Sequence, residues 1–337
     1  MKAIAYPKKL ANAEANVLQD VVLPDPIASG RDLLVDIKAI SVNPVDTKIR
    51  RGVDAAEGEW KVLGWDGAGI VQAIGPDVTG FKPGDRVWYA GSIARPGTNS
   101  ELHLVDERIV GKMPERLDFI QAAALPLTTI TAWEMLFDRF CIAQNASSEK
   151  GSLLIVGAAG GVGSIMIQLA SQLTGLTVIA SASRPETQAW VRQMGTHHVI
   201  DHRQPLSDEL QRIGIPQVEY IASLNQTDQH FAEMVKAIAP QGKIGLIDEP
   251  KSLDVLALKR KSVSLHWESM FTRSLLNTPD VARQGQMLTQ LAELVDAGRI
   301  QSTVSERFGS INAANLTRAH ALLESGTMRG KVVLAGF

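Results

Sequence analysis

The chain has 337 residues, of which 45% are hydrophobic and 21% are charged, a balance typical of globular proteins. Its formal net charge of -2 is not the excess of basic residues typical of nucleic-acid-binding proteins. The sequence also lacks a block of Lys and Arg that would predict a membrane-surface helix. No apolar run is long enough to span a bilayer, no signal-peptide core is present, and a single cysteine excludes an internal disulfide. We therefore expect a cytoplasmic protein that binds neither nucleic acid nor membrane, with two domains.

The first third of the chain is rich in predicted strands. Short β-branched runs at 32–43, 67–75, 85–91 and 101–110 are separated by turns rich in Gly, Pro and Asp. Helical spacing is poor in this region. The pattern predicts an antiparallel barrel or sandwich.

Strands and helices alternate further along the chain. Apolar runs at 153–157, 177–183, 197–201, 218–223 and 243–248 are each followed or preceded by an amphipathic segment. Continuous apolar strands that alternate with helices predict a parallel sheet covered on both faces. The tail adds two predicted helices and a short final strand.

A glycine-rich turn follows the first strand of this series and opens a helix. Gly157, Gly160 and Gly163 form a G-x-x-G-x-x-G pattern, with a further glycine at Gly161. Such glycines turn the chain sharply, let the backbone approach a pyrophosphate and let the helix pack close to the strand. We therefore predict that these glycines and Val162 bind a dinucleotide; the alternative is a purely structural turn.

The end of the second strand indicates which dinucleotide is bound. A carboxylate here normally bonds the ribose 2′-OH of NAD, but this chain has ASASRP at 180–185. Ser183 can donate to a phosphate oxygen, and Arg184 can pair with it through two N–H bonds. This favours NADPH. In the alternative interpretation Ser183 is a helix N-cap before Pro185, and Arg184 is solvated.

These motifs together resemble the medium-chain dehydrogenase/reductase superfamily, in particular its zinc-lacking quinone oxidoreductase-like branch, often labelled zinc-type alcohol dehydrogenase-like. The resemblance covers nearly the whole chain through SVNPVDTKIRRG (41–52), LGWDGAGIVQAIG (63–75), FKPGDRVWYAG (81–91), AAALPLTTITAWEML (122–136), IVGAAGGVG (155–163) and AHALLESGTMRGKVVL (319–334). It implies an α/β fold in which a Rossmann doubly wound parallel sheet is inserted in a GroES-like β-rich catalytic domain. The GroES-like domain would comprise 1–126 and 272–337, and the Rossmann domain 127–271. Relatives of this kind form homodimers or homotetramers.

The resemblance also bears on zinc. A catalytic zinc needs three protein ligands and an open position. In zinc-using relatives these include a Cys in the segment matching SVNPVDT, a His in the segment matching LGWDGAG and a Cys near ALPLTT. Here both cysteines are absent, and Trp65 replaces the histidine while Asp66 is kept. We therefore expect no metal site.

Further site residues follow from the resemblance. It implies that Asn43 lies beside the nicotinamide and substrate as a donor, and that Thr131 lies near the nicotinamide. Lys48 stands where many quinone-reducing relatives have Tyr, so it is either a donor to the substrate oxygen or a solvated side chain. His202 matches a tyrosine that flanks the ribose phosphate, although an ordinary surface role is equally open. The backbone near Phe271 is expected to contact the nicotinamide.

The function predicted from these features is transfer of a hydride from NADPH to a quinone or α,β-unsaturated carbonyl without zinc. Such acceptors need little Lewis-acid help, and the nicotinamide supplies the hydride. One alternative is a zinc-dependent alcohol dehydrogenase, and another is a non-catalytic NADPH-binding sensor or structural protein. A further alternative, an enoyl-thioester reductase, would need a basic patch for its carrier, which the sequence does not provide.

Overall fold

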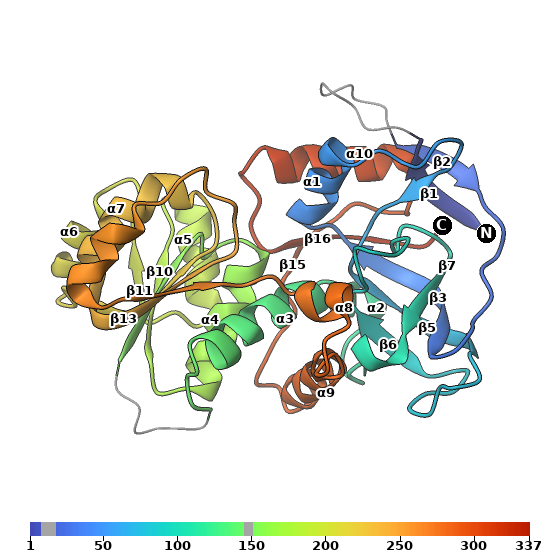
Figure 1. Ribbon diagram of the computed structural model, residues 1–337, viewed down its shortest axis with the longest axis horizontal. Coiled ribbons are helices and arrows are strands. Elements are labelled where there is room, and N and C mark those ends of the chain that lie inside the picture. Colours follow the sequence, from blue (N-terminus) through green and yellow to red (C-terminus); the bar gives the residue numbers. More distant parts are fainter. Residues whose placement is uncertain (8–17, 145–150) are drawn as a thin grey trace. The chain divides into compact units, whose positions relative to one another are not determined.

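The computed structural model describes residues 1–7, 18–144 and 151–337 and divides into two compact units (Figure 1). The first unit combines Met1–Ile130 with Phe271–Phe337, and the second unit is Thr131–Met270. The first boundary lies four residues beyond the expected one at 126/127. Residues 127–130 belong with the first unit, where the Leu127 N–H donates to a buried carboxylate at 2.8 Å.

Antiparallel strand pairs dominate the first unit. Its strands are β1 (Lys2–Tyr6), β2 (Gln19–Val22), β3 (Asp32–Ser41), β4 (Lys61–Val62), β5 (Gly67–Ile74), β6 (Arg86–Tyr89), β7 (Leu102–Asp106), β8 (Val110–Lys112), β15 (Val304–Arg307) and β16 (Lys331–Ala335). A seven-stranded sheet has the order β15-β16-β3-β5-β6-β8, with β7 also paired to β3, and a smaller sheet has the order β2-β1-β4. The sequence analysis predicted this β-rich antiparallel region correctly.

Short helices flank these sheets. They are α1 (Pro44–Gly52), α2 (Phe119–Ala123), α8 (Thr272–Leu276), α9 (Arg283–Asp296), α10 (Ala313–Glu324) and the 3-10 turn η1 (Glu107–Ile109), and α3 (Pro126–Trp133) crosses the boundary between the units. Asn43 is the N-cap of helix α1, its N–H donates to Asp46 at 2.8 Å, and Pro44 occupies the first helical position. Because β3 leads directly into this capped turn, Asn43 is fixed at the end of a buried strand.

The second unit is a doubly wound parallel sheet. Its strands are β9 (Ser152–Val156), β10 (Thr177–Ser181), β11 (His198–Ile200), β12 (Val218–Ser223), β13 (Ile238–Leu246) and β14 (Ser264–Trp267), in the order β11-β10-β9-β12-β13-β14. The intervening helical segments are α4 (Gly161–Leu173), α5 (Pro185–Gln193), α6 (Leu206–Arg212), α7 (Thr227–Ala237), the 3-10 segment η3 (Val255–Lys261) and, before β9, the π-helical η2 (Glu134–Arg139). The chain winds outward from β9 to β11 and then returns to β12. Since such crossovers are right-handed, this reversal puts helices on opposite faces of the sheet, as expected for a Rossmann fold.

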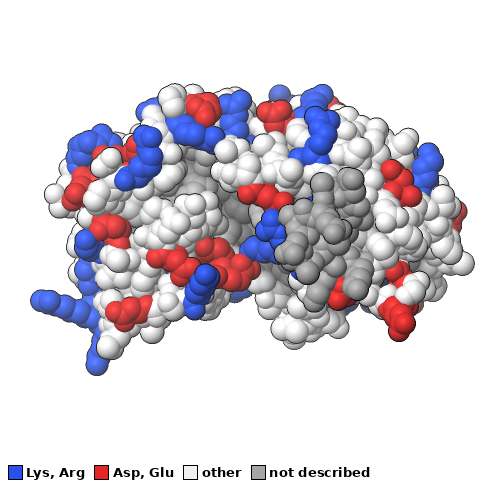
Figure 2. Space-filling model, turned by 90° about the horizontal axis from the view of Figure 1, so that it is seen from above, with Lys and Arg blue, Asp and Glu red and all other residues white. Residues whose placement is uncertain are grey.

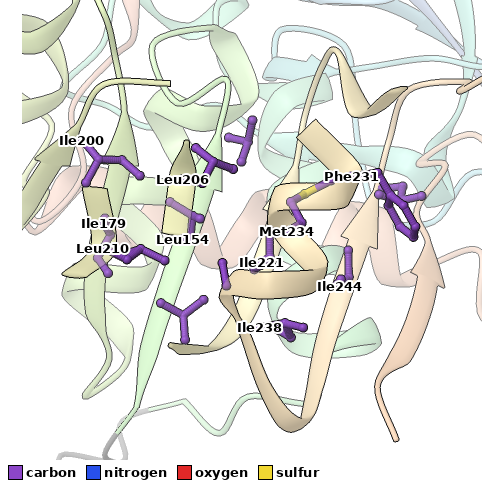
Figure 3. Close-up of a cluster of buried hydrophobic side chains, with 14 of the residues drawn as sticks. Leu154, Ile179, Ile200, Leu206, Leu210, Ile221, Phe231, Met234, Ile238 and Ile244 are labelled. Atoms are coloured by element: carbon purple, nitrogen blue, oxygen red, sulfur yellow. The ribbon is translucent and has the colours of Figure 1, made fainter. Parts of the chain in front are cut away.

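Apolar packing holds one face of this sheet against α6 and α7 (Figure 3). The buried strand residues include Leu154, Ile179 and Ile221, and they meet Leu210 and Met234 from the two helices. Burial of each such side chain contributes about 1.5–3 kcal/mol. The strand ends that carry the glycine loop are therefore built on a rigid core.

The face of the molecule viewed in Figure 2 shows no patch made of basic side chains alone. On the face viewed in Figure 2, Lys and Arg side chains lie among Asp and Glu side chains. A nucleic-acid surface instead concentrates Lys and Arg on one face. No helix in the described part of the chain is both long enough and apolar enough to cross a bilayer.

Candidate functional site

A glycine loop joins β9 to α4 at the carboxyl edge of the six-stranded sheet. Gly157 has a φ of +79°, in the left-handed region that favours glycine. A Cβ atom there would lie 2.4 Å from Oδ1 of Asn225, which follows β12. The Gly157 N–H donates to Oγ of Ser181, the last residue of β10, at 3.1 Å. The loop is thus surrounded by the ends of three strands at the point where the strand order reverses, where doubly wound sheets bind ligands.

Steric crowding excludes a side chain at one of two further glycines of the loop but not at the other. A Cβ atom on Gly163 would lie 2.3 Å from the Ala158 carbonyl oxygen, so packing within the protein requires glycine there. A Cβ atom on Gly160 would meet its nearest neighbour, the Gly157 carbonyl oxygen, at an ordinary 3.6 Å. Packing within the chain therefore does not explain glycine at position 160.

The first turn of α4 has the properties of an anion site. Gly160 is the N-cap of this helix and has no side chain with which to cap it. Gly161 and Val162 are half-buried at the first two helical positions. N–H groups in a first helical turn, together with the helix dipole, attract negative charge. These residues fit the pyrophosphate of a dinucleotide, and the absent side chain at Gly160 leaves room for it.

The segment after β10 carries the two predicted phosphate ligands. Arg184 is the N-cap of α5, with Pro185 at the first helical position. The alternative interpretation of Ser183 as the N-cap is therefore wrong. Thr187 satisfies this helix end instead: its Oγ1 accepts from the Arg184 N–H at 3.3 Å and donates to the Arg184 carbonyl at 2.9 Å. The hydroxyl of the half-buried Ser183 is not needed for the cap.

Arg184 has an acidic neighbour that the sequence analysis did not consider. Its Nε lies 3.3 Å from Oε1 of Glu186, and the two side chains are 38% and 50% exposed. Exposed ion pairs of this kind contribute little to stability because water screens them. Glu186 nevertheless competes with any bound anion for the Arg184 guanidinium.

His202 lies two residues after β11, the strand that neighbours β10. Burial lowers the pKa of its half-buried imidazole; the carboxylate of Asp201 opposes this effect, and the charges of Arg203 and Arg184 add to it. Nδ1 of His202 is buried and has no hydrogen-bond partner. The fold thus brings Arg184 and His202, from the ends of adjacent strands, close enough for their charges to interact.

Asn43, the predicted donor of the first unit, is almost fully buried. Its Nδ2 donates to Oδ2 of Asp66 at 2.8 Å, and its Oδ1 accepts a hydrogen bond from the Lys331 ammonium. These two contacts fix which end of the amide is oxygen and which is nitrogen. One of its two amide N–H groups is therefore directed into the protein rather than toward a ligand.

Asp66 is the centre of this buried network. Its Oδ2 also accepts from Oγ of Ser41 at 2.8 Å and lies 3.2 Å from Nζ of Lys331, and its Oδ1 accepts from the Leu127 N–H at 2.8 Å. Asp66 therefore joins β3, β5, β16 and α3 through one side chain.

Lys331 is a buried residue of this network that was not predicted from the sequence. Only 1% of the residue is exposed, and Nζ donates to the Val42 carbonyl at 2.8 Å as well as to Asn43 and Asp66. Burial lowers the pKa of this ammonium, and the charge of Asp66 opposes the shift. One signal was present in the sequence: a lysine at the head of the otherwise apolar final strand. A buried lysine needs such a partner.

Asp46 is a second buried carboxyl group in the same region. Its Oδ2 accepts from the Asn43 N–H, whereas its Oδ1 is buried without a hydrogen-bond partner. Burial raises the pKa of Asp46 to about 7; the Asn43 N–H and Lys331 oppose this rise, and Asp66 adds to it. The cost of burying a charge on Asp46 therefore outweighs the stabilisation by the Asn43 N–H and the Lys331 ammonium.

The remaining predicted residues occupy different environments. Lys48 is an exposed residue of α1, whereas Thr131 is buried in α3 and begins the second unit. Phe271 belongs to the first unit, where its ring meets Trp65 edge-on at 6.3 Å between centroids. The structure therefore joins Asn43 to Asp66 and Lys331, and Phe271 to Trp65, but leaves Lys48 on the surface.

The Trp65 side chain fills the position where zinc-using relatives have a histidine. It is buried, and its Nε1 donates to the Ser92 carbonyl at 3.1 Å. An indole of this kind is not among the usual zinc ligands. Within residues 1–7, 18–144 and 151–337, no three His, Cys, Asp or Glu side chains are grouped so that they could hold a metal ion.

Two family models match the chain: Alcohol dehydrogenase GroES-like domain over residues 29–115 and Zinc-binding dehydrogenase over residues 194–334. The chain is also 41% identical over 336 residues to a zinc-type alcohol dehydrogenase-like protein of Staphylococcus aureus, and the match covers 99% of both. The chain belongs to the medium-chain dehydrogenase/reductase superfamily. The predicted superfamily and the Rossmann and GroES-like fold are thereby confirmed, and the similar proteins include quinone oxidoreductases, which supports an oxidoreductase activity.

Solved structures of other medium-chain dehydrogenase/reductase proteins resemble the whole chain. A Rhizobium etli CFN 42 protein assigned as a zinc-dependent alcohol dehydrogenase is 54% identical, with a TM-score of 0.94, over 100% of this chain and 98% of the other. The quinone oxidoreductase of Pseudomonas syringae pv. Tomato DC3000 is 26% identical, with a TM-score of 0.83, over 99% of both chains.

Proposed function

We propose that this protein is an NADPH-dependent reductase of quinones or α,β-unsaturated carbonyls and works without zinc. The observation that carries the proposal is the anion site at the carboxyl edge of the parallel sheet. Packing within the protein would allow a side chain at Gly160, yet the residue there is glycine. Arg184 and the unpartnered Nδ1 of His202 lie on the neighbouring strand ends. Together they provide two places for negative charge, as a phosphorylated dinucleotide requires.

The residues of the second unit have separate roles in this proposal. The first turn of α4, with Gly157, Gly160, Gly161, Val162 and Gly163, would hold the pyrophosphate. Ser183 and Arg184 would hold the 2′-phosphate, with His202 beside them. The cofactor, when bound, supplies a hydride.

The first unit would supply the donor for the substrate oxygen. Lys331 and Asp66 hold the Asn43 amide in one orientation, and its second N–H would donate to the substrate oxygen. A donor fixed in this way can stabilise negative charge that develops on oxygen without first reorganising. The roles of Lys48 and Thr131 as substrate contacts, and of the Phe271 backbone beside the nicotinamide, are proposed from the family resemblance.

The absence of zinc is proposed from residue types. No cysteine is present in 41–47 or 124–129, and Trp65 stands at the histidine position. Elemental analysis of the purified protein tests this directly. Stoichiometric zinc whose removal abolishes activity would instead support the alternative, a zinc-dependent alcohol dehydrogenase.

The proposed homodimer or homotetramer is supported by the edge of the second sheet. β14 is the last strand of that sheet, and the Trp267 side chain at its end is 55% exposed. Exposed strand edges readily pair with another chain. Light scattering coupled to size exclusion measures the assembly, and a monomer at all concentrations would refute this part of the proposal.

The central experiment measures oxidation of NADPH, and of NADH as a control, with benzoquinone, phenanthrenequinone and a simple enone. We expect turnover with NADPH well above that with NADH. In Arg184→Ala, the ratio of kcat/KM for NADPH to that for NADH should fall roughly 10–100-fold, since a charge-assisted bond to a phosphate is lost. Saturable NADPH binding without turnover of any acceptor would favour the sensor or structural alternative.

A further inference from the structure

A second imidazole, that of His230, lies beside His202 in the second unit. The two ring centroids are 6.0 Å apart, and the rings meet edge-on at 73°. His230 lies in the first turn of α7, which follows β12, so both histidines stand at the carboxyl edge of the sheet. Each ring is half-buried. We call these two residues the histidine pair.

One nitrogen atom of the histidine pair has no hydrogen-bond partner in the protein. Nδ1 of His202 is buried and makes no hydrogen bond. A neutral imidazole has one donor and one acceptor nitrogen, whereas a protonated imidazole has two donors. Buried polar atoms almost always have partners, so an exception at a strand edge that binds anions suggests that a ligand supplies the missing partner.

The charges around the histidine pair are already compensated. The neighbouring charged side chains form ion pairs of their own: Arg203 with Asp201, Arg212 with Glu209, and Arg184 with Glu186. Burial lowers the pKa of His230, and the charge of His202 lowers it further. Burial likewise lowers the pKa of His202, against the effect of Asp201. Both rings are therefore mainly neutral at neutral pH in the free protein.

We propose that the histidine pair forms, with Arg184, a phosphate site that protonation strengthens, so that the preference for NADPH over NADH increases as the pH falls. This inference rests on the proposed use of NADPH. A phosphate dianion favours the charged imidazolium, and the charged ring in turn attracts the phosphate. Binding of NADPH must therefore raise the pKa of the rings, because the two effects are reciprocal.

The 2′-phosphate itself also titrates, since its second pKa is about 6. Its loss of charge at low pH works against the proposed effect. The wild-type protein must therefore be compared with variants that keep the phosphate unchanged and remove only an imidazole. His230→Phe keeps an aromatic ring without a titrating group, and His202→Gln keeps a polar side chain. His198→Gln is the matched control, because His198 lies in β11 outside the pair.

The first test measures dissociation constants of NADPH and NADH by calorimetry for these proteins. From about pH 8 to about pH 6, the NADPH-to-NADH affinity ratio of the wild type should rise roughly tenfold relative to either pair variant. His198→Gln should follow the wild type. Equal pH dependence in the wild type and both pair variants would overturn the inference. A wild type without preference for NADPH at any pH would contradict the proposed function itself.

A second test requires no turnover. Nuclear magnetic resonance follows the imidazole C–H signals of the histidine pair during pH titrations with NADP⁺, with NAD⁺ and without nucleotide. We expect the pKa of at least one ring to rise with NADP⁺ and to stay unchanged with NAD⁺. Identical titration curves with the two nucleotides would refute the role of the pair in phosphate recognition, even if NADPH binds.

Discussion

The two polar regions of the molecule differ in how completely their hydrogen bonds are used. In the first unit, Lys331 donates to three acceptors and Asp66 accepts from donors on both oxygens. At the carboxyl edge of the second unit, the Nδ1 atom of His202 has no partner and Gly160 leaves space that packing does not require. We assign the completed network the role of positioning Asn43, and the incomplete one the role of binding a ligand.

The largest effect is expected where the completed network is broken. Lys331→Met leaves Asp66 as a buried charge without its cation, and loss of one partner of a buried pair costs about 3–5 kcal/mol. The variant should therefore unfold at a much lower urea concentration than the wild type. Equilibrium unfolding measured by circular dichroism gives the free energy.

Two further variants serve as controls for Lys331. Lys331→Arg keeps the charge and should lose less stability, while Asp66→Asn combined with Lys331→Met should recover part of the loss. If Lys331→Met is as stable as the wild type, the network does not depend on the ammonium and the comparison between the two regions fails.

Substitutions at two glycines of the loop distinguish an effect on packing from an effect on NADPH binding. Gly163→Ala pushes a Cβ atom against the Ala158 carbonyl oxygen, and such overpacking typically costs about 1–3 kcal/mol. Gly160→Ala should leave stability within about 0.5 kcal/mol of the wild type, yet weaken NADPH binding at least tenfold. Thermal unfolding and calorimetric binding are measured on both variants. Wild-type NADPH affinity in Gly160→Ala would show that the space is not used by a cofactor.

Asp46 is the exception within the completed region, because its Oδ1 has no partner. Its pKa is raised to about 7 in the folded protein, so the folded state binds a proton more tightly than the unfolded state, in which Asp titrates near 3.9. This contribution to stability is present at low pH and is lost as the pH rises toward 7.

Asp46→Asn removes that pH dependence. Relative to the wild type, the variant should gain at least about 1 kcal/mol between about pH 4.5 and about pH 8, measured by urea unfolding at each pH. A stability difference that is the same at both pH values would mean that Asp46 is ionised throughout and that its pKa is not raised.

The smallest effect is expected at the exposed pair of the second unit. Glu186→Gln removes the competitor for the Arg184 guanidinium, and exposed pairs contribute at most about 1 kcal/mol. NADPH affinity should therefore rise by no more than about fivefold, with NADH affinity unchanged. Glu293→Gln on α9 in the first unit is the control. Weaker NADPH binding in Glu186→Gln would show that Glu186 orients Arg184 rather than competing for it.

Local patterns in the sequence predicted most of the fold. Apolar runs located the parallel strands of the second unit. A glycine motif is also local, so the loop at 157–163 could be recognised. The partners of Lys331 and His230 could not be found in this way, because they come from other elements and only the fold brings them together. Ser183 is not the N-cap because α5 begins at Pro185, which makes Arg184 the N-cap.

The contact of Lys331 with Asn43 has a consequence for biosynthesis. The two residues are 288 positions apart, and the first unit is built from both ends of the chain. At about 5–20 residues per second, a ribosome takes roughly 15–60 s to travel from one to the other. The whole second unit is synthesised during that interval, before the Lys331 ammonium can contact Asn43. A nascent chain interrupted before its last strand therefore lacks the cation that fixes the Asn43 amide in one orientation.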